Sequence, residues 1–95
     1  MRLRYTRPAL SDLASILDYI EERSPQGAAH TQARIQAVIG LLPRYPLIGA
    51  PTDDPTIRRV IATPYPYVIL YEVGDDEVIV HTVRHSARRP AEPPR

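Results

Sequence analysis

The segment HTVRHSARRP, residues 81–90, places two histidines and three arginines within ten residues, directly after a run of β-branched residues. Imidazoles exchange protons near neutral pH and arginines stabilise charge on a phosphate, so this composition could cleave RNA. The same cations could instead dock onto an acidic protein surface, because a guanidinium pairs bidentately with carboxylates. A third interpretation is a solvated tail. The elements that position the segment must decide among the three.

Two pairs of side chains sharpen this question. His81 and His85 are four residues apart, so they share a face if the strand persists, and they could then do acid–base work. The alternative is that His81 packs within the sheet and His85 anchors the C-terminal segment. Arg58 and Arg59 occupy adjacent strand positions and point to opposite faces, so one of them can lie over an exposed sheet face. Ion-paired strand arginines are the alternative there.

The composition excludes several classes of site. There is no cysteine, and all twelve basic residues are arginine, so disulfides, thiolate metal sites and lysine acid–base chemistry are absent. Two histidines without an adjacent carboxylate are too few for a metal centre, and we expect no metal and no cofactor. No apolar run approaches the ~20 residues of a membrane helix, and the N-terminus lacks an apolar signal core. We therefore expect a soluble, cytoplasmic protein.

Charge is distributed unevenly along the chain. Residues 9–22 contain four acids and no base, whereas residues 83–95 contain four arginines and one glutamate. The basic end could attract an acidic surface or nucleic acid. The acids could face a partner or form the solvated side of a helix.

The N-terminal half has the pattern of a strand followed by two helices. Residues 1–6 alternate, and Thr6 or Arg7 then leads into a helix with Pro8 in its first turn. Ser24 can cap a second helix that Pro25 opens and Pro43 stops. The predicted apolar stripes are Leu10, Leu13, Leu17 and Ile20 on the first helix, and Ala28, Ile35, Val38, Ile39 and Leu42 on the second.

The C-terminal half changes to a strand pattern. After a proline-rich loop at 43–55, three β-branched and aromatic segments follow at 56–62, 67–73 and 77–84. Gly74 and two aspartates provide a hairpin turn between the last two segments. We predict one α+β domain over residues 1–95, with 86–95 as a tail: an N-terminal strand, an antiparallel helix hairpin, then a three-stranded antiparallel sheet (β-α-α-β-β-β).

Four segments in this order resemble the RelE/ParE superfamily of toxins from bacterial toxin–antitoxin pairs, and the ParE branch in particular. They are YTRPALSDLASILDYI at 5–20, LLPRYPLIGAP at 41–51 with its Pro46-x-x-Gly49, IRRVIATPYPYVILYEV at 57–73, and VIVHTVRHSARRP at 78–90. Each segment alone is weakly specific, but together they span nearly the whole chain. The fold that this resemblance implies is the one that periodicity predicts.

The resemblance implies a toxin that a small antitoxin neutralises. That antitoxin is expected to be ParD-like, with a ribbon-helix-helix part that binds DNA and a C-terminal segment that wraps the toxin. The toxin chain alone is not expected to bind DNA or a membrane. RelE-like members cut mRNA in the ribosome, whereas ParE-like members are associated with inhibition of DNA gyrase. A degenerate, non-toxic member that only binds an antitoxin is a further possibility.

Several departures from the RelE-like pattern favour the ParE branch. RelE-like enzymes resemble one another in using lysines, arginines and often a tail tyrosine, and this chain has no lysine and no tyrosine after Arg84. Thr63 stands where RelE-like chains tend to carry an arginine. We therefore predict a non-enzymatic gyrase inhibitor whose target-binding residues are Arg58, Arg84, His85, Arg88 and Arg89. If the chain is RelE-like instead, the predicted catalytic residues are His85, Arg88 and Arg58.

Overall fold

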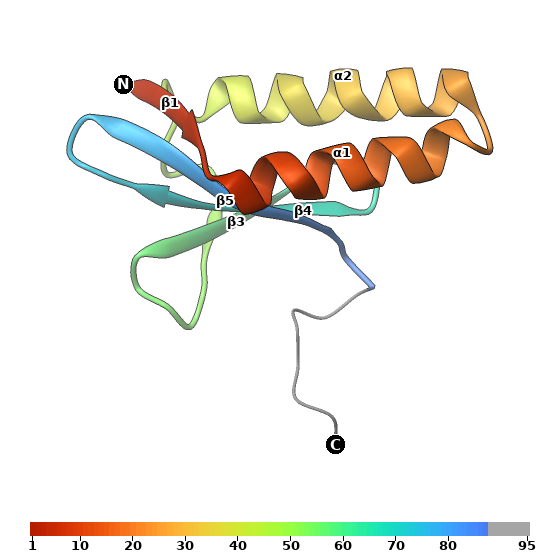
Figure 1. Ribbon diagram of the computed structural model, residues 1–95. Helices are drawn as coiled ribbons and strands as arrows, with labels where there is room; N and C mark the ends of the chain where they lie inside the picture. Colours follow the sequence, from red (N-terminus) through yellow and green to blue (C-terminus); the bar gives the residue numbers. More distant parts are fainter. Residues whose placement is uncertain (88–95) are drawn as a thin grey trace.

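The computed structural model describes residues 1–87, and within them two helices cover one face of a five-stranded sheet (Figure 1). The sheet has the strand order β1-β5-β4-β3-β2. In chain order the elements are β1 (Arg2–Tyr5), α1 (Arg7–Glu21), α2 (Pro25–Leu41), β2 (Ala50–Pro51), β3 (Ile57–Ile61), β4 (Tyr67–Val73) and β5 (Glu77–His85). The predicted α+β fold, with one strand and a helix hairpin before the remaining strands, is confirmed.

Both helices begin where the sequence predicts. The Thr6 side chain accepts a hydrogen bond from the Ala9 amide, and the Ser24 side chain accepts one from the Gly27 amide. A proline lies in the first turn of each helix, where its missing N–H leaves no unpaired partner. The hydroxyl caps therefore fix both helix starts, and the short connection between the helices makes them an antiparallel pair.

The sheet differs from the prediction in two respects. The first strand joins it in parallel, with Tyr5 beside Val80, so the sheet is mixed rather than purely antiparallel. The loop at 43–55 also contributes the two-residue edge strand β2, in which Ala50 pairs with Arg59. The parallel pairing is possible because α1 and α2 form a long crossover between β1 and the later strands.

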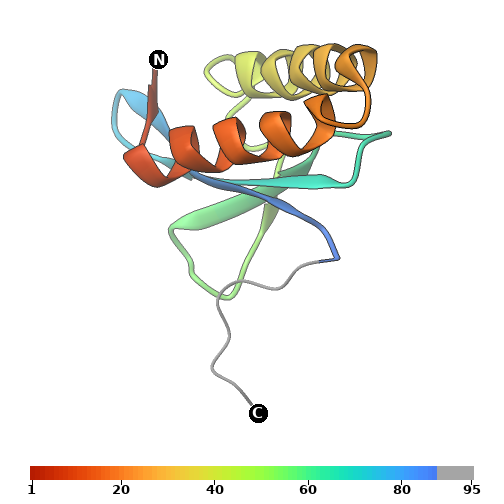
Figure 2. The same ribbon diagram turned by 45° about the vertical axis from the view of Figure 1, so that its right-hand side comes forward.

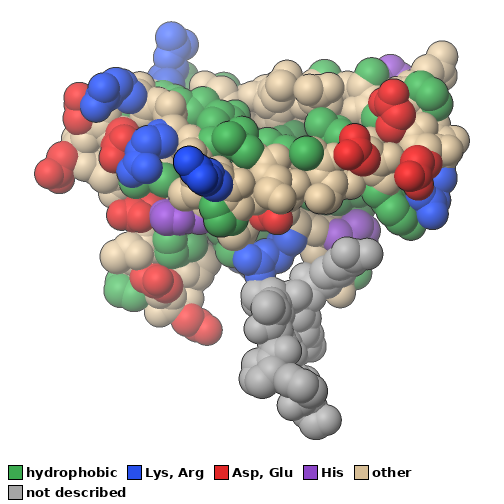
Figure 3. Space-filling model, viewed as in Figure 1, with side chains coloured by type: hydrophobic (Ala, Val, Ile, Leu, Met, Phe, Trp, Pro, Cys, Tyr) green, Lys and Arg blue, Asp and Glu red, His purple; other side chains and the backbone are tan. Residues whose placement is uncertain are grey.

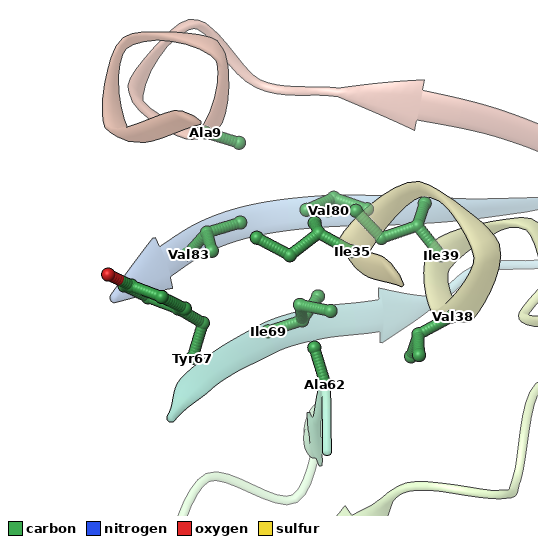
Figure 4. Close-up of a cluster of buried hydrophobic side chains, with 9 residues drawn as sticks. All are labelled: Ala9, Ile35, Val38, Ile39, Ala62, Tyr67, Ile69, Val80 and Val83. Carbon is green, nitrogen blue, oxygen red and sulfur yellow. The ribbon is translucent and has the colours of Figure 1, made fainter. Parts of the chain in front are cut away.

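The core lies between the helices and the upper face of the sheet (Figures 1 and 2). Figure 4 shows Ile35, Val38 and Ile39 of α2 together with Ile69 and Val80 of the sheet. All five predicted apolar positions of the second helix are buried. The prediction for α1 was wrong in one place. Leu10 is exposed, whereas Ala9 is fully buried against the sheet.

The opposite face of the sheet carries no helix in the described part of the chain (Figures 1 and 2). Alternation along the paired strands turns one set of side chains toward the helices and the other set toward this open face. Tyr67, Ile69 and Tyr71 face the helices and are buried. Val68, Leu70 and Glu72 lie on the open face and are partly exposed.

Candidate functional site

A groove of about 580 Å³ lies between α1 and the end of β5. One wall is a stripe of α1, because residues spaced by three or four positions share a helix face. The other wall comes from the start of β4 and the last residues of β5. The groove is lined by Asp12, Ser15, Ile16, Tyr19, Tyr67, Val83, Arg84, His85 and Ala87.

The free edge of β5 runs along this groove. β1 pairs with β5 only as far as Val80, and past that point side chains from the start of α1 contact the edge. The Thr6 hydroxyl donates to the His81 carbonyl oxygen at 2.9 Å, and an Asp12 carboxylate oxygen accepts from the Val83 amide at 3.1 Å. Thr6 and Asp12 therefore occupy positions where a further strand would otherwise make hydrogen bonds.

His85 lies at the lip of the groove in a defined orientation. Its Nδ1 accepts a hydrogen bond from the Ala87 amide at 3.0 Å, so the neutral ring carries its proton on Nε2. The ring meets the Tyr67 ring edge-on, with 5.4 Å between the ring centroids. This arrangement agrees with a histidine that anchors the start of the C-terminal segment.

His81 points elsewhere. The ladder between β4 and β5 shifts register between Leu70 and Tyr71, and this bulge lies opposite His81. His81 Nε2 lies 2.7 Å from a carboxylate oxygen of Glu72 on the open face, whereas His85 contacts Tyr67 on the helix side. The two histidines therefore do not share a face, because the bulge interrupts the regular strand and its extra residue reverses the alternation.

The structure separates the arginines that the sequence grouped together. Arg84 borders the groove, but it is paired with Val68, so its guanidinium lies toward the open face and donates to the Thr82 hydroxyl at 3.1 Å. Arg58 is paired with Tyr71 on the helix side of the sheet, and its Nη1 donates to the Gly49 carbonyl oxygen at 2.6 Å. Arg58 therefore does not join Arg84 at the groove. The other two predicted target-binding residues, Arg88 and Arg89, lie outside the described residues.

A buried clasp behind the predicted Pro46-x-x-Gly49 motif was not foreseen from the sequence. The Tyr71 hydroxyl is fully buried, donates to the Pro46 carbonyl oxygen at 2.7 Å and accepts from the Gly49 amide at 2.9 Å. A Cβ on residue 49 would lie 2.5 Å from this hydroxyl and 2.8 Å from the Arg59 carbonyl oxygen. Glycine is therefore required at position 49. The two ends of the motif, Pro46 and Gly49, are both hydrogen-bonded to Tyr71, and these bonds fix the loop to the sheet.

The surface charges follow the uneven distribution along the chain. Figure 3 shows acidic side chains over the second half of α1 and arginine side chains below it, at the end of β5. On the open face, Arg4 of β1 forms an ion pair with Glu77 of β5 at 3.1 Å. The hydrogen bonds from Arg4, and then its charge, hold the pKa of the Glu77 carboxyl below its ordinary value. This pair ties the two parallel strands together.

Among residues 1–87, no three histidine, cysteine, aspartate or glutamate side chains gather closely enough to hold a metal ion. The described helices are also too short or too polar to cross a membrane. The groove offers backbone edge groups, apolar and tyrosine side chains, a hydroxyl, the Asp12 carboxylate, one imidazole and, at its border, one guanidinium. Such a surface can hold a peptide segment in a defined register.

Known proteins resemble this chain in both sequence and fold. The family profile described as "ParE toxin of type II toxin-antitoxin system, parDE" matches residues 3–90. The "Toxin RelE2" of Caulobacter vibrioides is 38% identical over 84 residues, which cover 88% of this chain and 93% of that protein. A structure titled "Chromosomal ParDE TA system from P. aeruginosa" superposes with a TM-score of 0.79 at 23% identity, covering 90% of this chain and 95% of that chain, and supports the fold. The chain therefore belongs to the ParE toxin family of type II toxin–antitoxin systems.

Proposed function

We propose that this toxin acts by binding and inhibiting DNA gyrase, without catalysing a reaction itself, and that a ParD-like antitoxin neutralises it. The observation that carries the proposal is the placement of the groups that RNA cleavage would need. His81 is paired with Glu72 on one face, His85 lies at the other side of the sheet, and Arg58 holds a loop. The two histidines and Arg58, whose residue types suit RNA cleavage, thus do not meet at one point.

The end of β5 is the target-binding part of the proposal. His85 and Arg84 border the groove from the helix side and the open face of β5, respectively, and Arg88 and Arg89 follow them in the sequence. Arginine suits a contact with an acidic protein surface, because its planar guanidinium pairs with carboxylates in a fixed geometry. In this account Arg58 acts indirectly, because its guanidinium positions the loop at Gly49.

The same groove suggests how an antitoxin neutralises the toxin. An antitoxin segment that packs between α1 and β5 would cover Arg84 and His85, and would thereby compete directly with the target. An extended segment could also take over the edge groups of β5 that Thr6 and Asp12 now contact. Neutralisation then needs no change in the toxin's fold.

The alternative is a RelE-like endonuclease that cleaves mRNA in the ribosome. The observation that favours it is the relative named Toxin RelE2, which covers most of this chain. In that case His85, Arg88 and Arg58 would be catalytic. The position of Arg58 on the helix side, bonded to Gly49, weighs against this set, because its guanidinium would have to leave a 2.6 Å hydrogen bond to reach RNA.

Two single substitutions distinguish binding from catalysis. We expect Arg84→Ala and His85→Ala each to weaken growth arrest several-fold when the toxin is induced in its host, because binding contacts share the free energy. Arg7→Ala, at the exposed start of α1 and outside both the groove and the loop after α2, is the matched arginine control for the groove. Complete loss of toxicity in His85→Ala alone, with an unchanged melting temperature, would instead indicate a catalytic imidazole. Equal toxicity in all three variants would remove the groove from the target interface.

A further inference from the structure

The segment Leu41–Ile48, called the 41–48 patch below, presents four of the chain's most exposed large apolar side chains. The exposed fractions are 46% for Leu41, 50% for Tyr45, 66% for Leu47 and 49% for Ile48. Two consecutive turns shape the segment: the Tyr45 amide donates to the Leu41 carbonyl oxygen, and the Ile48 amide to that of Tyr45. Clustered exposed apolar side chains of this kind mark interaction sites on soluble proteins.

The patch is held rigidly from beneath. The Tyr71 hydroxyl bonds to both Pro46 and Gly49, and the Arg58 guanidinium bonds to Gly49 from the other side. A buried tyrosine, a half-buried arginine and an obligatory glycine thus fix a loop on which Leu41, Tyr45, Leu47 and Ile48 are exposed. A loop fixed before binding loses little conformational entropy when it docks, which favours a role in recognition.

The charges around the patch indicate what it docks against. Within the patch, the charged residue is the exposed Arg44, which lies between the exposed Leu41 and Tyr45. An apolar patch with one exposed guanidinium fits an apolar surface that carries a carboxylate. Four apolar side chains are far fewer than the ~20–30 residues that each side of a stable interface uses, so the patch is one anchor of a larger contact.

We propose that the 41–48 patch is a second anchor by which this toxin grips the protein that it inhibits. The patch follows the end of α2, near the start of β5, whereas the groove lies at the end of β5 (Figures 1 and 2). The two anchors therefore lie toward opposite ends of the molecule. This inference rests on the proposed binding mode of toxicity, and it holds whichever protein is the target.

The test uses the variant Leu47→Ser/Ile48→Ser of the full chain, with Leu10→Ser as the control. Leu10 is 53% exposed on α1 and lies outside the groove and the patch. Growth arrest is measured at matched levels of induced protein, together with the melting temperature and co-purification with the antitoxin. We expect the double variant to need at least tenfold more protein for arrest, with unchanged melting and antitoxin binding, and Leu10→Ser to behave as wild type.

A second variant tests the clasp. Tyr71→Phe keeps the buried ring but removes the hydroxyl that holds Pro46 and Gly49, and we expect it to need several-fold more protein for arrest. Arrest by the double variant at wild-type levels would overturn the inference. So would retained toxicity with lost antitoxin binding, which would assign the patch to the antitoxin, or a wild-type chain that causes no arrest. A wild-type chain that arrests growth without inhibiting gyrase would refute only the gyrase proposal.

Discussion

Gly49 shows how one residue couples the sheet to a loop. Its amide and carbonyl are bonded to Tyr71 and Arg58, and the space for a side chain is filled by the Tyr71 ring and the Arg59 backbone. The sequence identified the position only as part of a family-like motif. The reason for the glycine needs the register of β3 and β4, because that register brings Tyr71 and Arg59 to the loop.

We predict that Gly49→Ala lowers the free energy of unfolding by about 1–3 kcal/mol or more, because the added methyl group cannot fit without moving backbone. Gly40→Ala is the matched control: residue 40 lies in α2 with open space around it, and alanine there should add about 0.5–1 kcal/mol. Chemical denaturation measures both variants. Equal stability of Gly49→Ala and wild type would show that the loop is not held as described.

Glu77 gives a residue-scale prediction for pH. Its pKa is lowered by Arg4 in the folded chain, so the pair contributes stability above the ordinary carboxyl value of 4.5 and loses it as pH falls through the lower folded value. Glu77→Gln should therefore lower the melting temperature slightly at pH 7, and this effect should shrink as pH falls through the lowered pKa and wild-type Glu77 becomes protonated. A difference that is independent of pH would argue against this ion pair.

The histidines mark the limit of residue-scale prediction. Their spacing predicted a shared face, and the shared face depended on an unbroken strand. A single bulge places His81 beside Glu72 and leaves His85 beside Tyr67. A bulge depends on pairing with another strand, so the local pattern of β5 could not reveal it. The opposite orientations of Arg58 and Arg59 were predictable, because they follow from simple alternation within β3.

At the scale of elements, hydrogen bonds between the start of α1 and β5 shape the groove. The Thr6 side chain makes two of the relevant bonds: it accepts from the Ala9 amide, which caps α1, and it donates to the His81 carbonyl oxygen of β5. Asp12, in the second turn of α1, accepts a hydrogen bond from the Val83 amide. The start of α1 is thereby fixed against the strand that carries Arg84 and His85.

We predict that Thr6→Ala costs about 1–2 kcal/mol of stability, because it removes both a helix cap and a hydrogen bond to β5. Ser24→Ala removes only a cap, that of α2, and should cost less, about 0.5–1 kcal/mol. Urea denaturation of the two variants gives the comparison. If Ser24→Ala is the more damaging variant, the bond from Thr6 to β5 contributes nothing to stability.

The helices and the three long strands could be predicted from the sequence, because caps, prolines and periodicity act locally. The edge strand β2 could not be predicted, because two residues carry no period and pair only where β3 presents its edge. The parallel place of β1 depends on the handedness of the crossover and on the whole sheet. The groove is likewise a product of two elements that lie about 70 residues apart in the chain.

At the scale of the whole molecule, the chain is a small scaffold with two surfaces toward opposite ends. The groove presents strand-edge groups, Arg84 and His85, and the 41–48 patch presents apolar side chains on a fixed loop. The family match shows a toxin of a type II toxin–antitoxin system, and we propose that both surfaces bind its target. An antitoxin segment in the groove would cover one of these surfaces directly.

The most direct test of this account is a titration of DNA supercoiling by the host's gyrase with the purified, folded chain. We predict inhibition at near-stoichiometric toxin, relieved by an equimolar antitoxin and lost after heat denaturation of the toxin. At the same toxin concentration, mRNA that is bound to ribosomes should remain uncleaved. Unimpaired supercoiling at a large excess of folded toxin, together with cleavage of ribosome-bound mRNA, would contradict the account and make His85 the first catalytic candidate.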